Sequence, residues 1–191
     1  MTHRNRLRSA WNRVGSGEIH RAPREWQPWL SDTGSLTQKI EKAIGQKLEV
    51  QVLRDCPQSL NSDESRYFHF KLRRCRVREV LLCANNIPLV MAHSVIPTLS
   101  SSGSNHGVLR LGTKPLGAVL FAKTRKHSKP KFPREIARLD KSSALWKKCS
   151  KHFSGLSSPL WARRTLYRLK GHPILVNEIF LPELLTHLKT K

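Results

Sequence analysis

Residues 163–182 read RRTLYRLKGHPILVNEIFLP, and this stretch decides the fold class. Two strand-like runs flank a Gly-His pair at 171–172, a pattern that is typical of a β-hairpin with a tight turn. One carboxylate, Glu178, stands in the second run. Because side chains alternate along a strand, it should share a face with three apolar neighbours: Ile174, Val176 and Phe180. A carboxylate on an apolar face is costly to bury unless another group pairs with it.

Three segments upstream predict more of the same architecture. Residues 47–55 alternate between apolar and polar side chains, as a half-buried strand does. Residues 65–84 predict one or two strands, and the apolar run at 87–97 follows Asn85-Asn86, which is a second hairpin signal. Several hairpins without alternating βαβ units indicate an α+β fold with an antiparallel sheet.

A helix is predicted at residues 36–44, where Leu36, Ile40 and Ile44 are spaced by four residues. Gly45 suits its C-terminal end. Three side chains offer oxygen atoms that could cap its start: Asp32, Thr33 and Ser35.

The remaining segments carry weaker signals. Residues 108–122 predict a short helical or mixed segment around Pro115. Turn-rich loops are expected at 56–65 and 98–107, and helical stretches are expected at 134–140 and 143–152 within a long basic segment, 123–159. We divide the chain into a basic, flexible lead-in at residues 1–25 and one folded domain at residues 26–191.

The composition excludes several classes of protein. No run of about 18 apolar residues is present, so no transmembrane helix is expected. The four cysteines form no CxxC pair and the nine histidines form no HExxH motif, so we infer neither a metal site nor a disulfide framework. Unpaired thiols fit a reducing cytoplasm, which is the location we expect for the protein.

The net charge of +22 raises the question of a polyanionic partner. Residues 122–170 contain 15 Lys or Arg against two carboxylates, Glu135 and Asp140. No zinc finger, helix-turn-helix or aromatic RNA-binding motif accompanies this charge, which favours the simpler alternative of a solvated basic surface. The charge could also steer an anionic substrate or attract the protein to an anionic membrane surface.

Four motifs occur in an informative order: WLSDTGSLTQKI (29–40), VREVLLCANNIPLVMAHSVIP (77–97), LGTKPLGAVLF (111–121) and LWARRTLYRLKGHPILVNEIFLPELL (160–185). In this order they resemble the chorismate pyruvate-lyase family, the 4-hydroxybenzoate synthases of bacterial ubiquinone biosynthesis. The resemblance covers roughly residues 26–183. It implies a single α+β domain whose helices and flap loops cover a buried ligand pocket. It also implies conversion of chorismate to 4-hydroxybenzoate and pyruvate by a monomer, without cofactor or metal.

The resemblance places the site residues by motif position. Arg78 matches the substrate-binding arginine and Glu178 matches the essential, catalytic glutamate. Leu36 and Leu116 match two residues that line the ligand site through their backbone; as an alternative, both are simply core leucines.

The chemistry of the two charged residues agrees with these roles. Chorismate is a dianion, and the guanidinium of Arg78 could bind its ring carboxylate with a planar fork; otherwise Arg78 is an edge-strand arginine that reaches solvent. Glu178 could take or relay the ring proton, and burial would raise the pKa of such a carboxyl while a nearby arginine would lower it. The alternative is a structural salt bridge of Glu178 with Arg164 or Arg168.

Two rival functions belong to other classes of protein. The same fold resembles the ligand-sensing domain of certain bacterial transcription regulators, so fold alone does not decide function. About 25 residues precede the first motif, too few for the winged helix-turn-helix of such a regulator, which favours the enzyme. The other rival is a protein that binds nucleic acid through residues 122–170, although we expect no obligatory nucleic-acid partner.

Overall fold

The computed structural model describes residues 11–14, 17–68, 75–98, 111–121, 134–169 and 171–189. These residues form seven strands: β1 (Trp11–Arg13), β2 (Glu49–Gln58), β3 (Cys75–Ala84), β4 (Ile87–Pro97), β5 (Arg134–Leu139), β6 (Leu160–Leu169) and β7 (His172–Phe180). They also form a 3₁₀ helix and six α-helices: η1 (Glu18–Arg21), α1 (Gln27–Ser31), α2 (Leu36–Ile44), α3 (Ser62–Tyr67), α4 (Leu116–Phe121), α5 (Ala144–Ser150) and α6 (Glu183–Lys189). The strands pair antiparallel in one sheet of order β1-β5-β6-β7-β4-β3-β2, which confirms the predicted α+β class.

Both predicted hairpins are present. Asn85 and Asn86, between β3 and β4, have φ angles of 49° and 63°, the left-handed conformation that a two-residue hairpin turn requires. Gly171 has a φ of 88° between β6 and β7, a conformation that glycine adopts without steric cost. The second turn sets the register in which Arg163 of β6 lies opposite Glu178 of β7.

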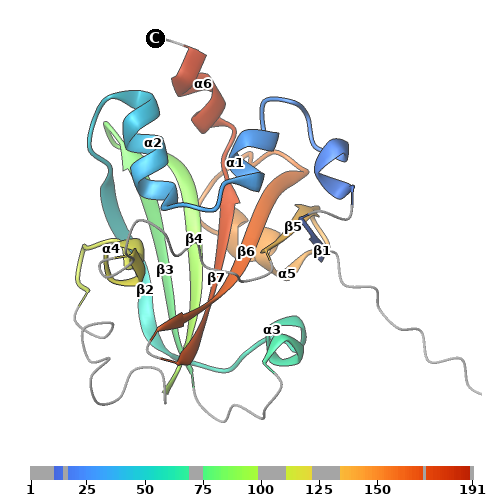
Figure 1. Ribbon diagram of the computed structural model, residues 1–191, viewed down its shortest axis with the longest axis vertical. Coiled ribbons are helices and arrows are strands. Elements are labelled where there is room, and N and C mark those ends of the chain that lie inside the picture. Colours follow the sequence, from blue (N-terminus) through green and yellow to red (C-terminus); the bar gives the residue numbers. More distant parts are fainter. Residues whose placement is uncertain are drawn as a thin grey trace, which may run out of the picture.

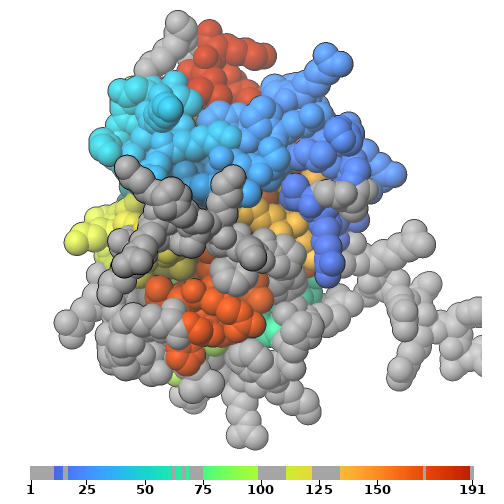
Figure 2. All heavy atoms as spheres, viewed as in Figure 1, coloured from blue at the N-terminus to red at the C-terminus, as the bar shows by residue number. Residues whose placement is uncertain are grey.

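Helices cover both faces of the sheet. We call the face beneath α1 and α2 the inner face, because side chains of these helices and of α6 pack there on Val80, Leu82 and Phe180. The segment from η1 to α2 lies over the upper part of this face (Figure 1), and its blue to cyan atoms form a continuous cover there (Figure 2). Helix α5 packs on the opposite, outer face against Leu81 and Ile179. Glu178 therefore lies on the same face as Phe180, as predicted. The opposite face of β7 is covered as well, so neither face of this strand is open to solvent.

Helix α2 forms as its sequence predicts. The Ser35 hydroxyl accepts a hydrogen bond from the Gln38 N–H (3.4 Å), and Gly45 ends the helix with a φ of 67°. Such an N-cap typically contributes about 0.5–2 kcal/mol. The stripe of Leu36, Ile40 and Ile44 is buried in the core of the inner face, so packing and capping fix the same helix boundaries.

Three expectations from the sequence were wrong in part. Residues 134–139 form strand β5, not a helix. This segment pairs with β6, and its side chains point alternately to the two faces of the sheet. Strand β2 continues to Gln58, and α3 follows in the expected loop, where Asn61 and Glu64 form a capping box. Trp11–Arg13, expected in a loose lead-in, pairs with β5 at the sheet edge.

Other expectations were confirmed or lie outside the described residues. Helix α5 lies within the predicted stretch 143–152, and α4 is helical as the segment 108–122 allowed. The predicted loop at 98–107, apart from Thr98, and residues 1–10 of the lead-in lie outside the described residues. In the described part of the chain, no helix is both long enough and apolar enough to cross a membrane.

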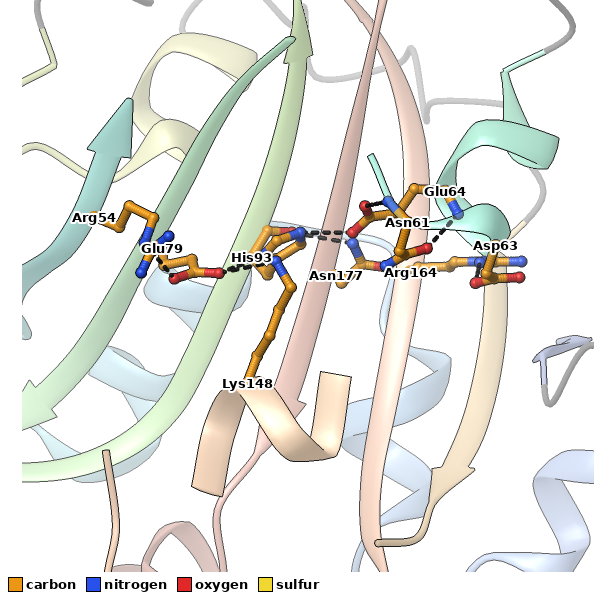
Figure 3. A network of polar contacts seen from close by, with 9 residues as sticks. All are labelled: Arg54, Asn61, Asp63, Glu64, Glu79, His93, Lys148, Arg164 and Asn177. Atoms are coloured by element: carbon orange, nitrogen blue, oxygen red, sulfur yellow. Dashed lines mark hydrogen bonds and ion pairs between the residues drawn. The ribbon is translucent and has the colours of Figure 1, made fainter. Parts of the chain in front are cut away.

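A network of charged side chains is buried on the outer face (Figure 3). The two ring nitrogens of His93 contact two carboxylates, Nε2 that of Glu64 at 2.7 Å and Nδ1 that of Glu79 at 2.9 Å. Lys148 of α5 and Arg54 of β2 each lie 3.4 Å from Glu79. The network thus attaches α3 and α5 to the sheet through charges rather than through apolar contacts alone.

Protonation of His93 holds this network together. Burial opposes the imidazolium, but the hydrogen bonds to Glu64 and Glu79 outweigh it and raise the pKa of His93 above its usual 6.5. The hydrogen bond with His93 lowers the pKa of Glu79 to about 2, and bonds from His93 and Asn61 outweigh burial to lower that of Glu64. One cation between two buried carboxylates is therefore the stable state.

This arrangement predicts a pH-dependent stability. The contribution of His93 is complete below pH 6.5 and is lost as the pH rises through its raised pKa, whereas that of Glu64 and Glu79 is complete above pH 4.5 and is lost in acid. Each unit of the His93 shift is worth about 1.4 kcal/mol. We expect the free energy of unfolding, measured with urea, to fall as the pH rises from 6.5 through the raised pKa of His93, and His93→Gln to flatten this slope. An unchanged slope in His93→Gln, or an equal flattening in the exposed control His172→Gln, would contradict the assignment.

Candidate active site

The candidate site lies on the inner face, where the sheet meets the loops that precede α2 and α4. Directly opposed residues of antiparallel strands point to the same face, so the register identifies which side chains line it. One row crosses five strands: Arg134, Thr165, Val176, Ser94 and Arg78. The adjacent row contains Arg163 and Glu178. Of the four residues predicted from the sequence, Arg78 and Glu178 lie on this face, and Leu36 and Leu116 lie at the starts of α2 and α4.

Arg78 is fixed beneath the loop before α4. Its Nη1 donates to Asp55 Oδ2 (2.9 Å), and its Nη2 donates to the carbonyl oxygens of Gly112 (2.7 Å) and Lys114 (3.3 Å). Only 2% of the residue is exposed, so the alternative of an arginine that reaches solvent is wrong. Burial opposes ionisation of Asp55, but hydrogen bonds from Arg76 and Arg78 outweigh it and lower its pKa. The sequence analysis missed Asp55, although it lies directly opposite Arg78 in β2.

Leu36 and Leu116 are the first residues of α2 and α4, and the two helix starts lie close together. A Cβ atom on Gly117 would lie 3.5 Å from Ser35 Oγ, which shows that the two helix starts are in van der Waals contact. The first N–H groups of a helix have no partner within the helix, which leaves backbone donors at both positions. A cavity of about 300 Å³ opens between the helices; Ser35 and Gly117 line it, whereas Arg78 and Glu178 do not. The side chain of Leu36 is part of the core, as the alternative interpretation expected, and its role as a backbone donor to a ligand stays a prediction.

Glu178 is held by Arg163, its cross-strand neighbour. The Nε of Arg163 contacts Oε2 of Glu178, and its Nη2 lies 3.3 Å from Oε1. The salt bridge considered in the sequence analysis therefore exists, but its predicted partners were wrong. Arg164 points to the outer face, where it contacts Asp63 (2.7 Å) and Glu135 (2.6 Å), and Arg168 is exposed and donates to the Gly171 carbonyl (3.2 Å).

Arg163 also connects the sheet to the segment that covers it. Its Nη1 donates to the carbonyl oxygens of Trp29 (3.0 Å) and Asp32 (2.8 Å), and the residue is fully buried. The segment from α1 to the start of α2 is thereby held above Glu178. The sequence contained a signal for this pair. The turn pairs Leu169 with His172, and counting six residues away from the turn along each strand brings residue 163 opposite residue 178.

Two further buried residues, Arg134 and Tyr167, lie near Glu178, and the sequence did not single them out as site residues. Arg134 donates from Nη2 to the Thr33 carbonyl (2.6 Å), and burial lowers its pKa. Tyr167 packs edge-on against Phe121 of α4, with ring centroids 5.8 Å apart. Burial and the negative charge of Glu178 raise the pKa of Tyr167, so its phenol is neutral at physiological pH.

Comparison with known proteins identifies the family of the chain. A model of the chorismate lyase family matches residues 7–190 of the chain. The chain belongs to the chorismate lyase family. A probable chorismate pyruvate-lyase of Thiobacillus denitrificans is 36% identical over 86% of this chain and 87% of its own length. A chorismate pyruvate-lyase of Photorhabdus laumondii is 30% identical over 84% of this chain and 83% of its own length.

Solved structures outside the chorismate lyase family share the fold alone. The effector domain of PhnF from Mycobacterium smegmatis aligns with a TM-score of 0.51 and 12% identity over 80% of this chain and 91% of that one. The ligand-binding domain of a putative GntR-family transcriptional regulator from Bordetella bronchiseptica aligns with a TM-score of 0.50 and 14% identity. This alignment covers 72% of this chain and 86% of that one.

The charged side chains of the inner face decide which ligands it could bind. Three buried arginines, Arg78, Arg134 and Arg163, lie on the inner face with the neutral phenol of Tyr167. Guanidinium groups in a low-dielectric environment bind carboxylates strongly and with defined geometry. Glu178 is the carboxylate nearest the middle of the sheet, on β7, and keeps lone pairs beyond those used by Arg163. The arrangement therefore suits an acidic small molecule that presents a hydroxyl or an acidic proton to Glu178.

Proposed function

We propose that this protein is a chorismate pyruvate-lyase, which converts chorismate to 4-hydroxybenzoate and pyruvate in the first step of ubiquinone biosynthesis. The observation that carries the proposal is the buried pair of functional groups on one face of the sheet. By resemblance, Arg78 and Glu178 correspond to the family's substrate-binding arginine and essential glutamate, and both are held by other side chains. Membership in the chorismate lyase family supports the same reaction.

Arg78 binds the ring carboxylate of chorismate in this proposal. Asp55 and the carbonyls of Gly112 and Lys114 hold the guanidinium in one orientation, so little side-chain entropy is lost when the substrate binds. The backbone N–H groups of Leu36 and Leu116 supply further donors near the two helix starts. Together these groups fix the position of the ring relative to Glu178.

Glu178 acts at the opposite end of the ring. The proton leaves C4, the electron pair of that C–H bond enters the ring, and the C3–O bond breaks with its electron pair on oxygen. The departing enolpyruvate takes up a proton and becomes pyruvate, so no oxidant or reductant is consumed. Arg163 orients the carboxylate of Glu178 to accept or relay the C4 proton, or to bind the C4 hydroxyl. Aromatisation supplies much of the driving force, so binding, orientation and removal of water account for the rest.

The reaction is tested by incubating the purified protein with chorismate. We expect stoichiometric formation of an aromatic product, followed by its ultraviolet absorbance, and of pyruvate, measured with lactate dehydrogenase and NADH. A Glu178→Gln preparation purified in the same way controls for contaminating enzymes. Binding of chorismate without formation of either product would instead favour a ligand-sensing role.

Replacing Arg78 with alanine tests the binding assignment. Loss of a charge-assisted carboxylate bond costs about 1.5–3 kcal/mol, so the dissociation constant for 4-hydroxybenzoate should rise roughly 10–150-fold in calorimetric titrations. Arg76→Ala is the matched control because Arg76 contacts the same Asp55 carboxylate from the same strand. An unchanged affinity in Arg78→Ala would remove Arg78 from the site, and equal losses in both variants would assign the effect to Asp55.

We further propose that the protein acts as a cytoplasmic monomer with no obligatory nucleic-acid partner. Its four cysteines are unpaired thiols, as a reducing compartment favours. The net charge of +22 favours rapid encounter with a dianionic substrate and also allows peripheral attraction to anionic surfaces. A fall in kcat/KM with rising salt, at constant kcat, would support electrostatic steering.

A further inference from the structure

Arg134 has bonding capacity that its surroundings do not use. The residue is only 6% exposed, and its Nη1 has no hydrogen-bond partner among the described residues. Its Nη2 donates to the Thr33 carbonyl (2.6 Å), which holds the guanidinium at the loop before α2. A buried charged donor without a partner is costly, so such a group points to a ligand.

The position of Arg134 relative to Arg78 is informative. The two arginines stand at opposite ends of one row across the inner face, four strand spacings apart, or roughly 19 Å along the sheet. The side chains between them are small: Thr165, Val176 and Ser94. Two cationic groups therefore flank a stretch of sheet whose buried side chains are small.

The groups near Arg134 show which end of the substrate it would meet. Its charge interacts with those of Glu178 and Asp32, opposite in sign, and with that of Arg163. Arg134 thus belongs to the Glu178 end of the site, away from Arg78. In chorismate the ring carboxylate is on C1, the hydroxyl is on C4, and the ether that carries the second carboxylate is on C3. A ring held at C1 by Arg78 with C4 at Glu178 must place the second carboxylate at the Glu178 end.

We propose that Arg134 binds the enolpyruvyl carboxylate of the substrate, so that the two carboxylates of one dianion are held by two separate arginines. This inference rests on the proposed function. Arg134 would then hold the leaving group while the C3–O bond breaks, without itself giving or taking a proton. The product 4-hydroxybenzoate lacks this carboxylate and would make no contact with Nη1 of Arg134.

Binding of two unreactive probes to the intact protein tests the proposal without relying on turnover. One probe is 4-hydroxybenzoate, and the other is 3-(carboxymethoxy)-4-hydroxybenzoate, which adds an ether-linked carboxylate next to the hydroxyl. Arg134→Met should weaken calorimetric binding of the second probe by about 10–100-fold and change binding of the first by less than about threefold. Arg78→Ala should weaken both. With chorismate itself, Arg134→Met should raise KM without the loss of kcat expected for Glu178→Gln.

Each outcome separates this inference from the proposed function. Equal changes for both probes, or no change for either, would overturn the role of Arg134 while leaving the reaction intact. If the wild-type protein binds neither probe and does not convert chorismate, the proposed function itself fails. Should Arg134→Met not fold, Arg134→Lys gives the same comparison, because it keeps the charge but loses the planar fork. It should weaken binding of the dianion selectively, and equal affinities to wild type would contradict the proposal.

Discussion

Replacing Glu178 with glutamine is expected to lower turnover of chorismate by about 10²–10⁴-fold, the usual range for general acid–base catalysis. The amide keeps the size of the side chain and one oxygen acceptor but loses the negative charge and the basic oxygen. Arg163 would keep its bonds to the carbonyls of Trp29 and Asp32, so the loop above the site should stay in position. The variant should therefore still bind 4-hydroxybenzoate while it loses activity.

The control for this variant is Glu183→Gln, which makes the same chemical change on the exposed first turn of α6. Its turnover should equal that of the wild-type protein. Steady-state rates and thermal melting, measured on all three proteins, separate catalysis from folding. Wild-type turnover in Glu178→Gln would refute the catalytic assignment, and a variant that unfolds would show that the ion pair with Arg163 is mainly structural.

The parts of the fold that could be predicted are those where local signals agree. Asn85-Asn86 fixes its hairpin because both residues accept positive φ angles, and α2 has a cap, an apolar stripe and a terminal glycine that coincide. Strand β5 could not be predicted, because REIARL over 134–139 carries charges that suit a helix surface. Its structure is decided instead by pairing with β6, which is distant in sequence. Local propensity therefore fails where tertiary pairing sets the backbone.

The residues of the candidate site also divide into those that the sequence indicates and those that only the structure reveals. Glu178 stands out in the sequence because it interrupts an apolar run, whereas Arg78 is singled out by the resemblance of its motif to the family, which predicts a role for both. Arg134 and Arg163 do not stand out, since they lie among 15 basic residues between 122 and 170. Only the register of β5, β6 and β7 shows that these two side chains face inward, whereas Arg164 faces the outer side. Three charges of this segment, those of Arg134, Arg163 and Arg164, are thus buried within the protein and are not part of a surface for a polyanion.

Replacing Arg163 with methionine should lower the free energy of unfolding by about 3–5 kcal/mol, the cost of leaving one member of a buried ion pair without its partner. Arg163 is fully buried, and its loss would leave both the Glu178 carboxylate and the carbonyls of Trp29 and Asp32 without their donor. Methionine fills a similar length of space, so the effect reports lost polar contacts rather than a cavity. Urea denaturation followed by circular dichroism measures the change.

A double-mutant cycle decides how much of this cost belongs to the ion pair. If the isolated carboxylate dominates, Arg163→Met combined with Glu178→Gln should recover part of the loss, because the neutral amide is cheaper to bury than an unpaired charge. If the double variant is no more stable than Arg163→Met, the bonds to the α1–α2 segment account for the whole effect. Arg168→Met, on the exposed side of the same strand, should change stability by no more than about 0.5 kcal/mol. A comparable loss in Arg168→Met would show that β6 tolerates no such change and that burial of Arg163 is not the cause.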